Sequence, residues 1–352
     1  MRAHLTIDLG AIAANWRALD AMTSAETGAV VKADAYGLGV DRVCPALAAA
    51  GAKTFFVALA EEGVAARAAL GPGPRIFVFS GLMAQDAALC LEHDLLPLLN
   101  SPRQAEDAAR AARGMGRLFP CGLQIDSGMN RLGFCESEDL DAFLASDIGK
   151  ALDVQLVMSH LACADEPSSE WNERQRKAFN ARRPAASASL AATGGVLLGP
   201  DYHFDLTRPG VGLYGGLPFE DASRVVSAEI PIIQRQQVKK GEIVGYGAAY
   251  VAERDMVTAT IAAGYADGLI RAMGAGFKGF IKGREVRSVG RVSMDLITLD
   301  VTDIPEGAFG TGMVELLGPN QTVDKLASAA GTIGYEILTS LGARYERRYI
   351  SA

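Results

Sequence analysis

The sequence predicts an α/β fold, a (β/α)8 barrel of the TIM type, followed by a mainly β C-terminal domain. Between about residues 10 and 218, short β-branched or aromatic runs alternate with Ala- and Leu-rich stretches at helical spacing. After Pro218 the chain changes to strand-like stretches with little helix between them. The 352 residues, 49% of them hydrophobic, supply enough apolar material for two domains.

The barrel rests on eight predicted strands. They are residues 30–35, 54–60, 75–80, 95–99, 121–126, 154–160, 187–193 and 203–209. The predicted helices between them include residues 41–50, 61–70, 101–113 and 170–180. Eight strands that alternate with helices match a closed barrel better than an open α/β sheet, which usually has fewer strands.

The C-terminal domain is predicted from a different sequence pattern. Its strand-like stretches are 225–233, 257–263, 285–301 and 313–318, and a helical pattern follows at 325–342. The Gly- and Pro-rich segment 212–221 marks the boundary between the alternating strand–helix pattern and the strand-rich pattern. We therefore expect a barrel at residues 8–218 and a β-rich domain made of residues 219–352 together with residues 1–7.

Composition argues against several classes of protein. Lys and Arg number 34 against 41 Asp and Glu, a formal charge of -7 without a long basic run, which disfavours nucleic acid as a partner. We find neither a signal-peptide pattern at the start nor an apolar stretch of 18 residues, so we expect a cytoplasmic protein that does not associate with membranes. Five cysteines without a CxxC pair indicate reduced thiols, and four scattered histidines predict no metal site.

Lys32 is the first candidate for chemistry. It lies within VVKADAYGLG (30–39), where Val30, Val31 and Ala33 surround it in a predicted strand. Partial removal from water lowers the pKa of an amine, which a Schiff-base lysine requires. The alternative is a structural ion pair at the mouth of the barrel, for example with Asp34, and spacing alone favours neither interpretation.

Four more polar side chains stand at or just past the ends of predicted barrel strands. They are Arg131, His160, Thr193 and Arg208. Each has a simple structural interpretation by itself: a solvated charge, a hydrogen-bonded histidine or a helix cap. Because active sites of such barrels are built at the carboxyl ends of the strands, we expect these four to share one cavity with Lys32.

A glycine-rich segment follows the last predicted strand. RPGVGLYGG (208–216) contains a GxGxxG match, but no amphipathic helix follows it and the strand closes a barrel, which disfavours a dinucleotide site. We expect the backbone N–H groups of Gly210 and Val211 to face a phosphate instead. His160 and Cys163 alone are weak evidence for a metal.

Several motifs together resemble a known family. VVKADAYGLG, DSGMNRLGF, MSHLACADE, FDLTRPGVGLYG, VGYGAAY, GYADG and GRVSMD are similar, in order and spacing, to the motifs of the alanine racemases. The similarity runs from about residue 5 to residue 349. It implies an isomerase that interconverts L-alanine and D-alanine with pyridoxal 5'-phosphate as cofactor, in a homodimer with shared active sites.

The resemblance also assigns roles to residues of the predicted barrel. Lys32 would carry the cofactor covalently and serve as one base. Tyr36, Thr193 and the amides of Gly210 and Val211 would hold the phosphate. Arg208 would face the pyridine nitrogen, His160 would lie beside the ring, and Arg131 would reach the phenolic oxygen and the substrate carboxylate.

Other roles fall in the predicted β domain. Tyr246 would be the second base and the Met294 amide would bind the carboxylate, both donated by the partner subunit. Tyr265, Asp295 and the barrel residue Gln124 are implied at the entrance or in the layer around the site. Two bases fit racemisation, because a proton leaves one face of the α-carbon and another returns on the opposite face.

The chain departs from the family pattern at a few positions. Gln124 stands where many members have a carboxylated lysine, Ala192 replaces an asparagine, Ser293 replaces a cysteine, and Ala343 stands where a phosphate-binding tyrosine is frequent. Tyr345 is the candidate replacement for that tyrosine. These changes make a wider substrate range possible. We expect Gln124 to hydrogen-bond the Arg131 guanidinium near a chloride or water; the alternative is an ordinary inward-facing barrel residue.

Two rival functions remain at this stage. One is another enzyme of the same architecture, either a racemase of broad specificity or an amino-acid decarboxylase; Arg208 disfavours the decarboxylase, which needs a protonated pyridine nitrogen. The other is a non-catalytic cofactor-binding protein, which would have no use for a β domain carrying Tyr246 and Met294. Both cell-wall synthesis and alanine breakdown are open as physiological roles.

Overall fold

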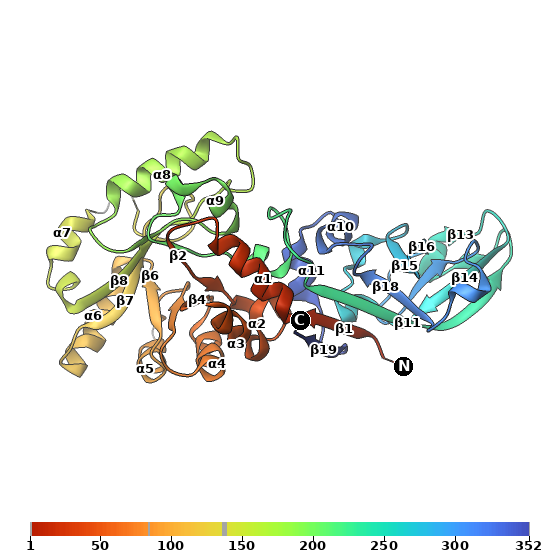
Figure 1. Ribbon diagram of the computed structural model, residues 1–352, viewed down its shortest axis with the longest axis horizontal. Helices are drawn as coiled ribbons and strands as arrows, with labels where there is room; N and C mark the ends of the chain where they lie inside the picture. The colour runs from red at the N-terminus through yellow and green to blue at the C-terminus, as the bar shows by residue number, and fades with distance from the viewer. Residues whose placement is uncertain (1, 84, 136–138, 352) are drawn as a thin grey trace. The chain divides into compact units, whose positions relative to one another are not determined.

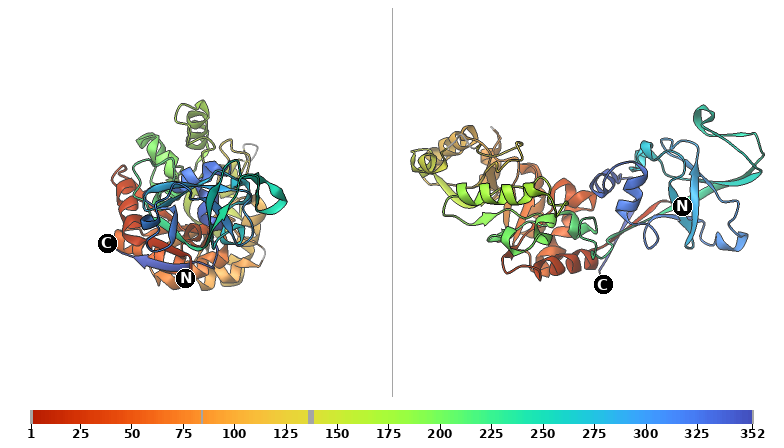
Figure 2. Two further views of the ribbon diagram at one scale, coloured as in Figure 1. Left: turned by 90° about the vertical axis from the view of Figure 1, so that its right-hand side faces the viewer. Right: turned by 90° about the horizontal axis from the view of Figure 1, so that it is seen from above.

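The computed structural model describes residues 2–83, 85–135 and 139–351 (Figure 1). The chain divides into two compact units. An α/β unit contains residues 12–213 and 218–221, and a β unit contains residues 1–11, 214–217 and 222–352. In Figure 2, the segments coloured orange to green belong mostly to the α/β unit and the teal to blue segments to the β unit.

The α/β unit alternates strands and helices. Its strands are β2 (Glu26–Thr27), β3 (Ala29–Val30), β4 (Thr54–Val57), β5 (Arg75–Val78), β6 (Leu96–Leu99), β7 (Phe119–Gln124), β8 (Leu152–Met158), β9 (Ala188–Ser189) and β10 (Leu206–Thr207). Its helices are α1 (Leu9–Asp20, begun in the β unit), α2 (Lys32–Gly37), α3 (Val40–Ala50), α4 (Ala60–Leu70), α5 (Asp86–Glu92), α6 (Pro102–Met115), α7 (Leu140–Ala145), α8 (Glu170–Arg182) and α9 (Thr193–Leu197).

The strands of this unit form a curled parallel sheet. Strands β3 to β9 pair in chain order. Strand β10 pairs with β2, and the amide of Gly28 donates to the carbonyl of Thr207 at 2.9 Å. On the other side, a bridge joins Arg208 to Ala192, just beyond β9. Hydrogen bonds thus connect the last strand to both ends of the sheet, and the predicted barrel architecture is confirmed.

Individual strand predictions need correction. The prediction of a strand at 30–35 is wrong beyond Val30, because the backbone turns into α2 from Lys32 onward. His160 lies two residues after β8 rather than at the end of the strand, and Thr193 opens α9 instead of ending a strand. Apolar runs identify buried segments of a barrel, but they do not show where a strand gives way to a loop.

The core of the barrel is apolar on both faces of its strands. All four residues of β4 and all four of β6 are buried. The Phe56 ring stacks on Phe77 and on Phe79, in each case with ring centroids 5.4 Å apart. A parallel sheet covered by helices buries both faces, so continuous apolar runs rather than alternating ones mark these strands.

The β unit consists mainly of antiparallel strands. They are β1 (His4–Asp8), β11 (Val226–Val238), β12 (Ile243–Val244), β13 (Tyr250–Val251), β14 (Met256–Ile261), β15 (Lys278–Ile281), β16 (Arg284–Val289), β17 (Ile297–Asp300), β18 (Met313–Leu317) and β19 (Glu346–Ile350). Two helices, α10 (Val323–Ala329) and α11 (Gly334–Ser340), precede the last strand.

Strand β11 organises this unit. The larger sheet has the order β14-β17-β16-β15-β18-β11-β1-β19, and β11 also pairs with β14, so six of its strands close a ring. The N-terminal strand β1 pairs with β11 and with β19. The first residues of the chain therefore complete the β sheet rather than the barrel.

Two predictions for the β unit also need refinement. The stretch 285–301 is not one strand but two, β16 and β17, separated by the turn that carries Ser293, Met294 and Asp295. The helical pattern at 325–342 is two short helices, because Gly331 between them has a φ of 65°. Pattern alone did not reveal either break.

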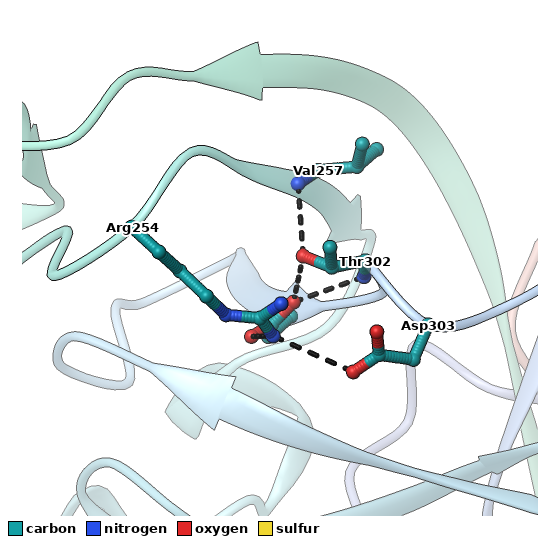
Figure 3. Close-up of polar contacts among 5 residues, drawn as sticks. Arg254, Val257, Thr302 and Asp303 are labelled. Carbon is teal, nitrogen blue, oxygen red and sulfur yellow. Dashed lines mark hydrogen bonds and ion pairs between the residues drawn. The ribbon is translucent and has the colours of Figure 1, made fainter.

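Side chains stabilise the turn that follows β17 (Figure 3). The Asp300 carboxylate accepts hydrogen bonds from the amide and the hydroxyl of Thr302, and that hydroxyl accepts from the amide of Val257 at 3.0 Å. Arg254 reaches Asp300 at 3.3 Å and Asp303 at 3.4 Å. This network is partly exposed and explains the local turn; it contains no feature of a ligand site.

Candidate functional site

Lys32 lies directly after β3, where the chain enters a left-handed turn. Residues Ala33, Asp34, Ala35 and Tyr36 have φ angles of 53–57°. For residues with a Cβ, this conformation costs roughly 1–2 kcal/mol each. Four consecutive residues of this kind require compensating contacts from the surrounding structure.

Those contacts come from both ends of the turn. At its start, the Ala33 amide donates to Oε1 of Glu62 at 2.8 Å. At its end, the Val40 amide donates to Oδ1 of Asp34 at 2.7 Å, and the Gly39 amide donates to the Asp34 carbonyl at 3.0 Å. Hydrogen bonds thus compensate the strained backbone immediately beside Lys32.

The Lys32 ammonium has an environment that favours its neutral form. Its Nζ lies 5.8 Å from the centroid of the Phe79 ring. Burial lowers the pKa of Lys32, the positive charge of Arg131 lowers it further, and the charge of Glu62 partly opposes both effects. A larger fraction of this amine is therefore neutral, and able to accept a proton, than for a lysine in water.

Arg208 is a buried guanidinium whose partners in the described part of the chain are uncharged oxygens. It donates to the hydroxyl of Ser189, to the carbonyl of Ser159 at 2.7 Å and to the carbonyl of Leu190 at 3.3 Å. Burial lowers the pKa of Arg208 to about 9, so the group is still mainly charged at pH 7. Because a buried charge without a counterion is costly, this arrangement is characteristic of a functional site.

Three cations act electrostatically on His160. Burial, followed by the charges of Arg208, Arg131 and Lys32, lowers its pKa to about 3. The ring is consequently neutral at pH 7, while its backbone carbonyl accepts a hydrogen bond from Gln175 at 3.0 Å. These charges raise the electrostatic potential in this region of the α/β unit, which favours an anionic ligand.

A polar cradle forms where the last barrel strand ends. The hydroxyl of Thr193 accepts hydrogen bonds from the amide of Gly210 at 3.0 Å and from that of Gly212 at 3.2 Å. A Cβ on Gly210 would lie 2.4 Å from the Tyr36 hydroxyl, so only glycine allows this close approach. The structure thus brings three of the predicted phosphate-binding residues together, and Val211 begins the adjoining 3-10 turn Val211–Tyr214.

The loop that carries Arg131 is held through its backbone. Oδ1 of Asp126 accepts the amides of Gly128, Met129 and Asn130 at 2.8–3.1 Å. From α8, Arg182 donates to the carbonyl of Asp126 at 2.6 Å. These hydrogen bonds fix the backbone conformation of the loop that carries Arg131.

Gln124 supports this loop in an unexpected way. Its side-chain nitrogen donates to the carbonyl of Leu132 at 3.2 Å, next to Arg131, whereas we expected it to hydrogen-bond the Arg131 guanidinium. The side chain is buried at the end of β7. Gln124 therefore positions the backbone that follows Arg131.

In the β unit, Tyr246 lies on a tight turn. It begins the 3-10 segment Tyr246–Ala248, between Gly245 with a φ of 75° and Gly247 with a φ of 68°. Its side chain is 75% exposed in the single chain. The Arg291 guanidinium lies beside Gly247, since a Cβ there would be 3.3 Å from its nitrogen.

The other predicted residues of this unit lie on two turns that touch. The amide of Tyr265 donates to the carbonyl of Ser293 at 3.0 Å, and the next amide donates to the carbonyl of Met294 at 3.0 Å. Arg344 joins the same turns, because it binds both oxygens of Asp267 and, at 2.7 Å, Oδ1 of Asp295. Tyr265, Met294 and Asp295 are therefore brought together.

Tyr345 is buried in the β unit, and its hydroxyl has no hydrogen-bond partner among the described residues. Burial raises its pKa.

Sequence reasoning missed several residues around the site. Ser159, Ser189 and Leu190 supply the oxygens that Arg208 binds, and Gln175 holds the backbone of His160. Glu62, which accepts the Ala33 amide beside Lys32, was also missed. It stands at the third position of α4, just after a strand, where an acidic residue is a recognisable capping signal.

Two further properties follow from the described part of the chain. Across residues 2–83, 85–135 and 139–351, no three His, Cys, Asp or Glu side chains gather in an arrangement suited to a metal ion. No helix in those ranges is both long and apolar enough to cross a membrane.

Comparison with known families gives the same architecture. Residues 7–218 match the family described as alanine racemase, N-terminal domain, and residues 225–349 match alanine racemase, C-terminal domain. The chain belongs to the alanine racemase family. Together the two matches cover nearly all of the sequence, including every candidate site residue.

Alanine racemases of known sequence and structure are similar over their full length. The alanine racemase of Cereibacter sphaeroides (strain ATCC 17029 / ATH 2.4.9) is 53% identical over 352 residues, covering 99% of this chain and 98% of the relative. A crystal structure of alanine racemase from Bartonella henselae with covalently bound pyridoxal phosphate is 36% identical, with a TM-score of 0.93 and coverage of 99% and 100%. The biosynthetic alanine racemase from Pseudomonas aeruginosa is 35% identical, with a TM-score of 0.90 and coverage of 99% of both chains.

The neutral state of His160 predicts a pH dependence of stability. Below pH 6.5 the unfolded chain binds a proton on His160 that the folded chain, with a pKa of about 3 at this position, does not bind. The free energy of unfolding should therefore fall by about 2 kcal/mol from this group between pH 7.5 and pH 5. Urea unfolding at both pH values should show this loss in the wild type and a smaller one in His160→Gln. A His93→Gln control should behave like the wild type; equal losses in all three proteins would contradict the prediction.

Proposed function

We propose that this chain binds pyridoxal 5'-phosphate in its α/β unit and interconverts L-alanine and D-alanine, with Lys32 and Tyr246 as the two bases. One observation carries the proposal: the Arg208 guanidinium is buried and, among the described residues, its printed hydrogen bonds go to uncharged oxygens. The positive charges of Lys32, Arg131 and Arg208 also act together on His160. Such a site favours an anionic ligand. Membership of the alanine racemase family supports the same conclusion.

The residues present fit the cofactor. Its phosphate matches the cradle of Thr193, Gly210 and Tyr36: the Thr193 hydroxyl accepts the Gly210 and Gly212 amides and keeps its own O–H to donate, and the Tyr36 hydroxyl lies beside Gly210. Its aldehyde matches an amine of lowered pKa, that of Lys32. When bound, pyridoxal phosphate withdraws electrons from an attached amino acid and so acidifies its α-proton.

Lys32 and Tyr246 would move the protons. A larger fraction of Lys32 Nζ is neutral and so available as a base, because burial disfavours its charged form. Oη of Tyr246 would act on the opposite face, so that one residue removes the α-proton while the other returns one. A single base would return the proton to the face it left and give no racemisation.

Arg208 would limit the reaction to racemisation. A guanidinium that remains mainly charged at pH 7 donates hydrogen bonds and does not transfer its proton to a pyridine nitrogen. Electron withdrawal is then weaker than with a carboxylate partner, which shortens the life of the carbanion and suppresses side reactions. This argues against a decarboxylase.

Arg131 would bind the substrate carboxylate. The guanidinium fork matches a carboxylate, and the loop that carries it is held by Asp126, Arg182 and Gln124. Because Gln124 carries no charge, we propose that the site accepts alanine without a carboxylated lysine. We also propose that Ala192 and Ser293, which stand where other family members have asparagine and cysteine, widen the range of substrates.

We also propose a homodimer in which each subunit completes the other's site. Tyr246 is 75% exposed and Met294 is 53% exposed in the single chain. A base that water surrounds could not control proton transfer, so a second copy must cover it. Cys44, Cys90, Cys121 and Cys163 are free thiols, which supports a cytoplasmic location.

Lys32 should carry the cofactor. Borohydride reduction of the protein with bound pyridoxal phosphate, followed by peptide mapping, should find the label on Lys32, because this is the amine with a lowered pKa beside the cationic site. Lys32→Ala should lose the label and the activity, while Lys53→Ala should keep both. A label on Lys53 or Lys282 would contradict the assignment.

Replacing Tyr246 by Phe should remove one base only. We expect kcat for racemisation to fall by about 10²–10⁴-fold with cofactor binding retained. In deuterium oxide, exchange of the α-proton should persist for one enantiomer and disappear for the other. Tyr250→Phe, which alters a nearby tyrosine, should leave both exchange rates unchanged. Equal loss of exchange from both enantiomers would show that Tyr246 does not act on one face.

Shared sites predict complementation between inactive variants. Mixing Lys32→Ala with Tyr246→Phe should restore part of the activity, because one site of each mixed dimer then receives both wild-type residues. Subunit exchange is checked by mass spectrometry of differently tagged chains. Verified exchange without recovered activity would argue for sites built within one chain.

A further inference from the structure

Glu62 contacts two separate segments of the α/β unit with its two carboxylate oxygens. Oε2 accepts the amide of Ala58 at 2.7 Å and that of Leu59 at 3.4 Å. Oε1 accepts the amide of Ala33 at 2.8 Å, from a residue 29 positions earlier in the chain. One carboxylate therefore joins the start of α4 to the turn that follows Lys32.

Helix capping accounts for only one of the two carboxylate oxygens. An acidic side chain at the third position of a helix commonly accepts the N-cap amide, which Oε2 does here for Leu59. That cap does not need Oε1. The second oxygen is thus available for the Ala33 amide, and this contact calls for a different explanation.

The Ala33 amide belongs to the peptide group that joins Lys32 to Ala33. Because a peptide group is planar, holding this N–H fixes the backbone rotation at Lys32 and with it the direction in which its side chain leaves the chain. Ala33 is also the first of the four residues with left-handed φ angles. Glu62 therefore acts at the start of the strained turn, and Asp34 closes its other end on the Val40 amide.

We infer that Glu62 is a positioning residue, which orients Lys32 by holding the Ala33 amide and so keeps the left-handed turn closed. The inference rests on the proposed role of Lys32 as the cofactor-bearing base. The hydrogen bond between Ala33 and Glu62 is observed independently of that role. The negative charge of Glu62 also acts on Lys32, since it opposes the lowering of the lysine pKa.

Glu62→Ala removes both sets of contacts, and Glu61→Ala is the matched control one residue earlier on the same helix. Glu61 is exposed. Amide hydrogen exchange of the protein with bound pyridoxal phosphate should accelerate about ten-fold or more across residues 33–40 in Glu62→Ala, because a hydrogen bond to a charged group is lost. We expect kcat/KM for alanine to fall about ten-fold with the cofactor still bound.

Glu62→Gln keeps the shape of the side chain but only one of its two acceptor oxygens. It should give faster exchange at Ala33, Ala58 or both, with an intermediate kcat/KM. This variant carries the test if Glu62→Ala does not fold. Exchange and kcat/KM equal to those of Glu61→Ala, in whichever Glu62 variant folds, would overturn the inference. Borohydride labelling elsewhere than Lys32 would instead overturn the proposed function, even if exchange in residues 33–40 accelerates.

Discussion

A concentration of positive charge around His160 is the constraint on which the rest of the α/β unit depends. The positive charges of Lys32, Arg131 and Arg208 all act on His160, and burial raises the cost of keeping Lys32 and Arg208 charged. The structure offsets this cost in local ways. Carbonyl and hydroxyl oxygens solvate Arg208, Glu62 lies near Lys32, and His160 stays neutral. The remaining attraction for an anion is what a phosphate and a carboxylate would use.

Hydrogen bonds to the backbone also hold the two segments that carry Arg131 and Lys32. The loop with Arg131 is built on amides gathered by Asp126 and on carbonyls held by Arg182 and Gln124. The Lys32 turn is built on amides held by Glu62 and Asp34. In each case other side chains hold the peptide groups of the segment that carries the cation.

Much of this could be predicted from the sequence. Apolar runs located most of the barrel strands, since both faces of a parallel sheet are buried, and the polar residues after those runs are the ones from which the site is proposed. The left-handed turn could not be predicted, because Ala33, Ala35 and Tyr36 have no preference for positive φ and the apolar context favours a strand. The Gln124 contact was missed for a similar reason: a side chain's choice between the Leu132 carbonyl and a guanidinium depends on loop geometry.

The left-handed turn has a consequence for how this protein can be stabilised. Glycine at Ala33 or Ala35 would relieve the strain of a positive φ, but it would also increase the conformational entropy of the unfolded chain, which opposes folding. Valine or isoleucine would reduce that entropy and be sterically excluded. At the exposed Ala33 the strain of roughly 1–2 kcal/mol exceeds the entropic cost of about 0.4–1 kcal/mol, so this turn is itself a place where glycine would raise thermal stability.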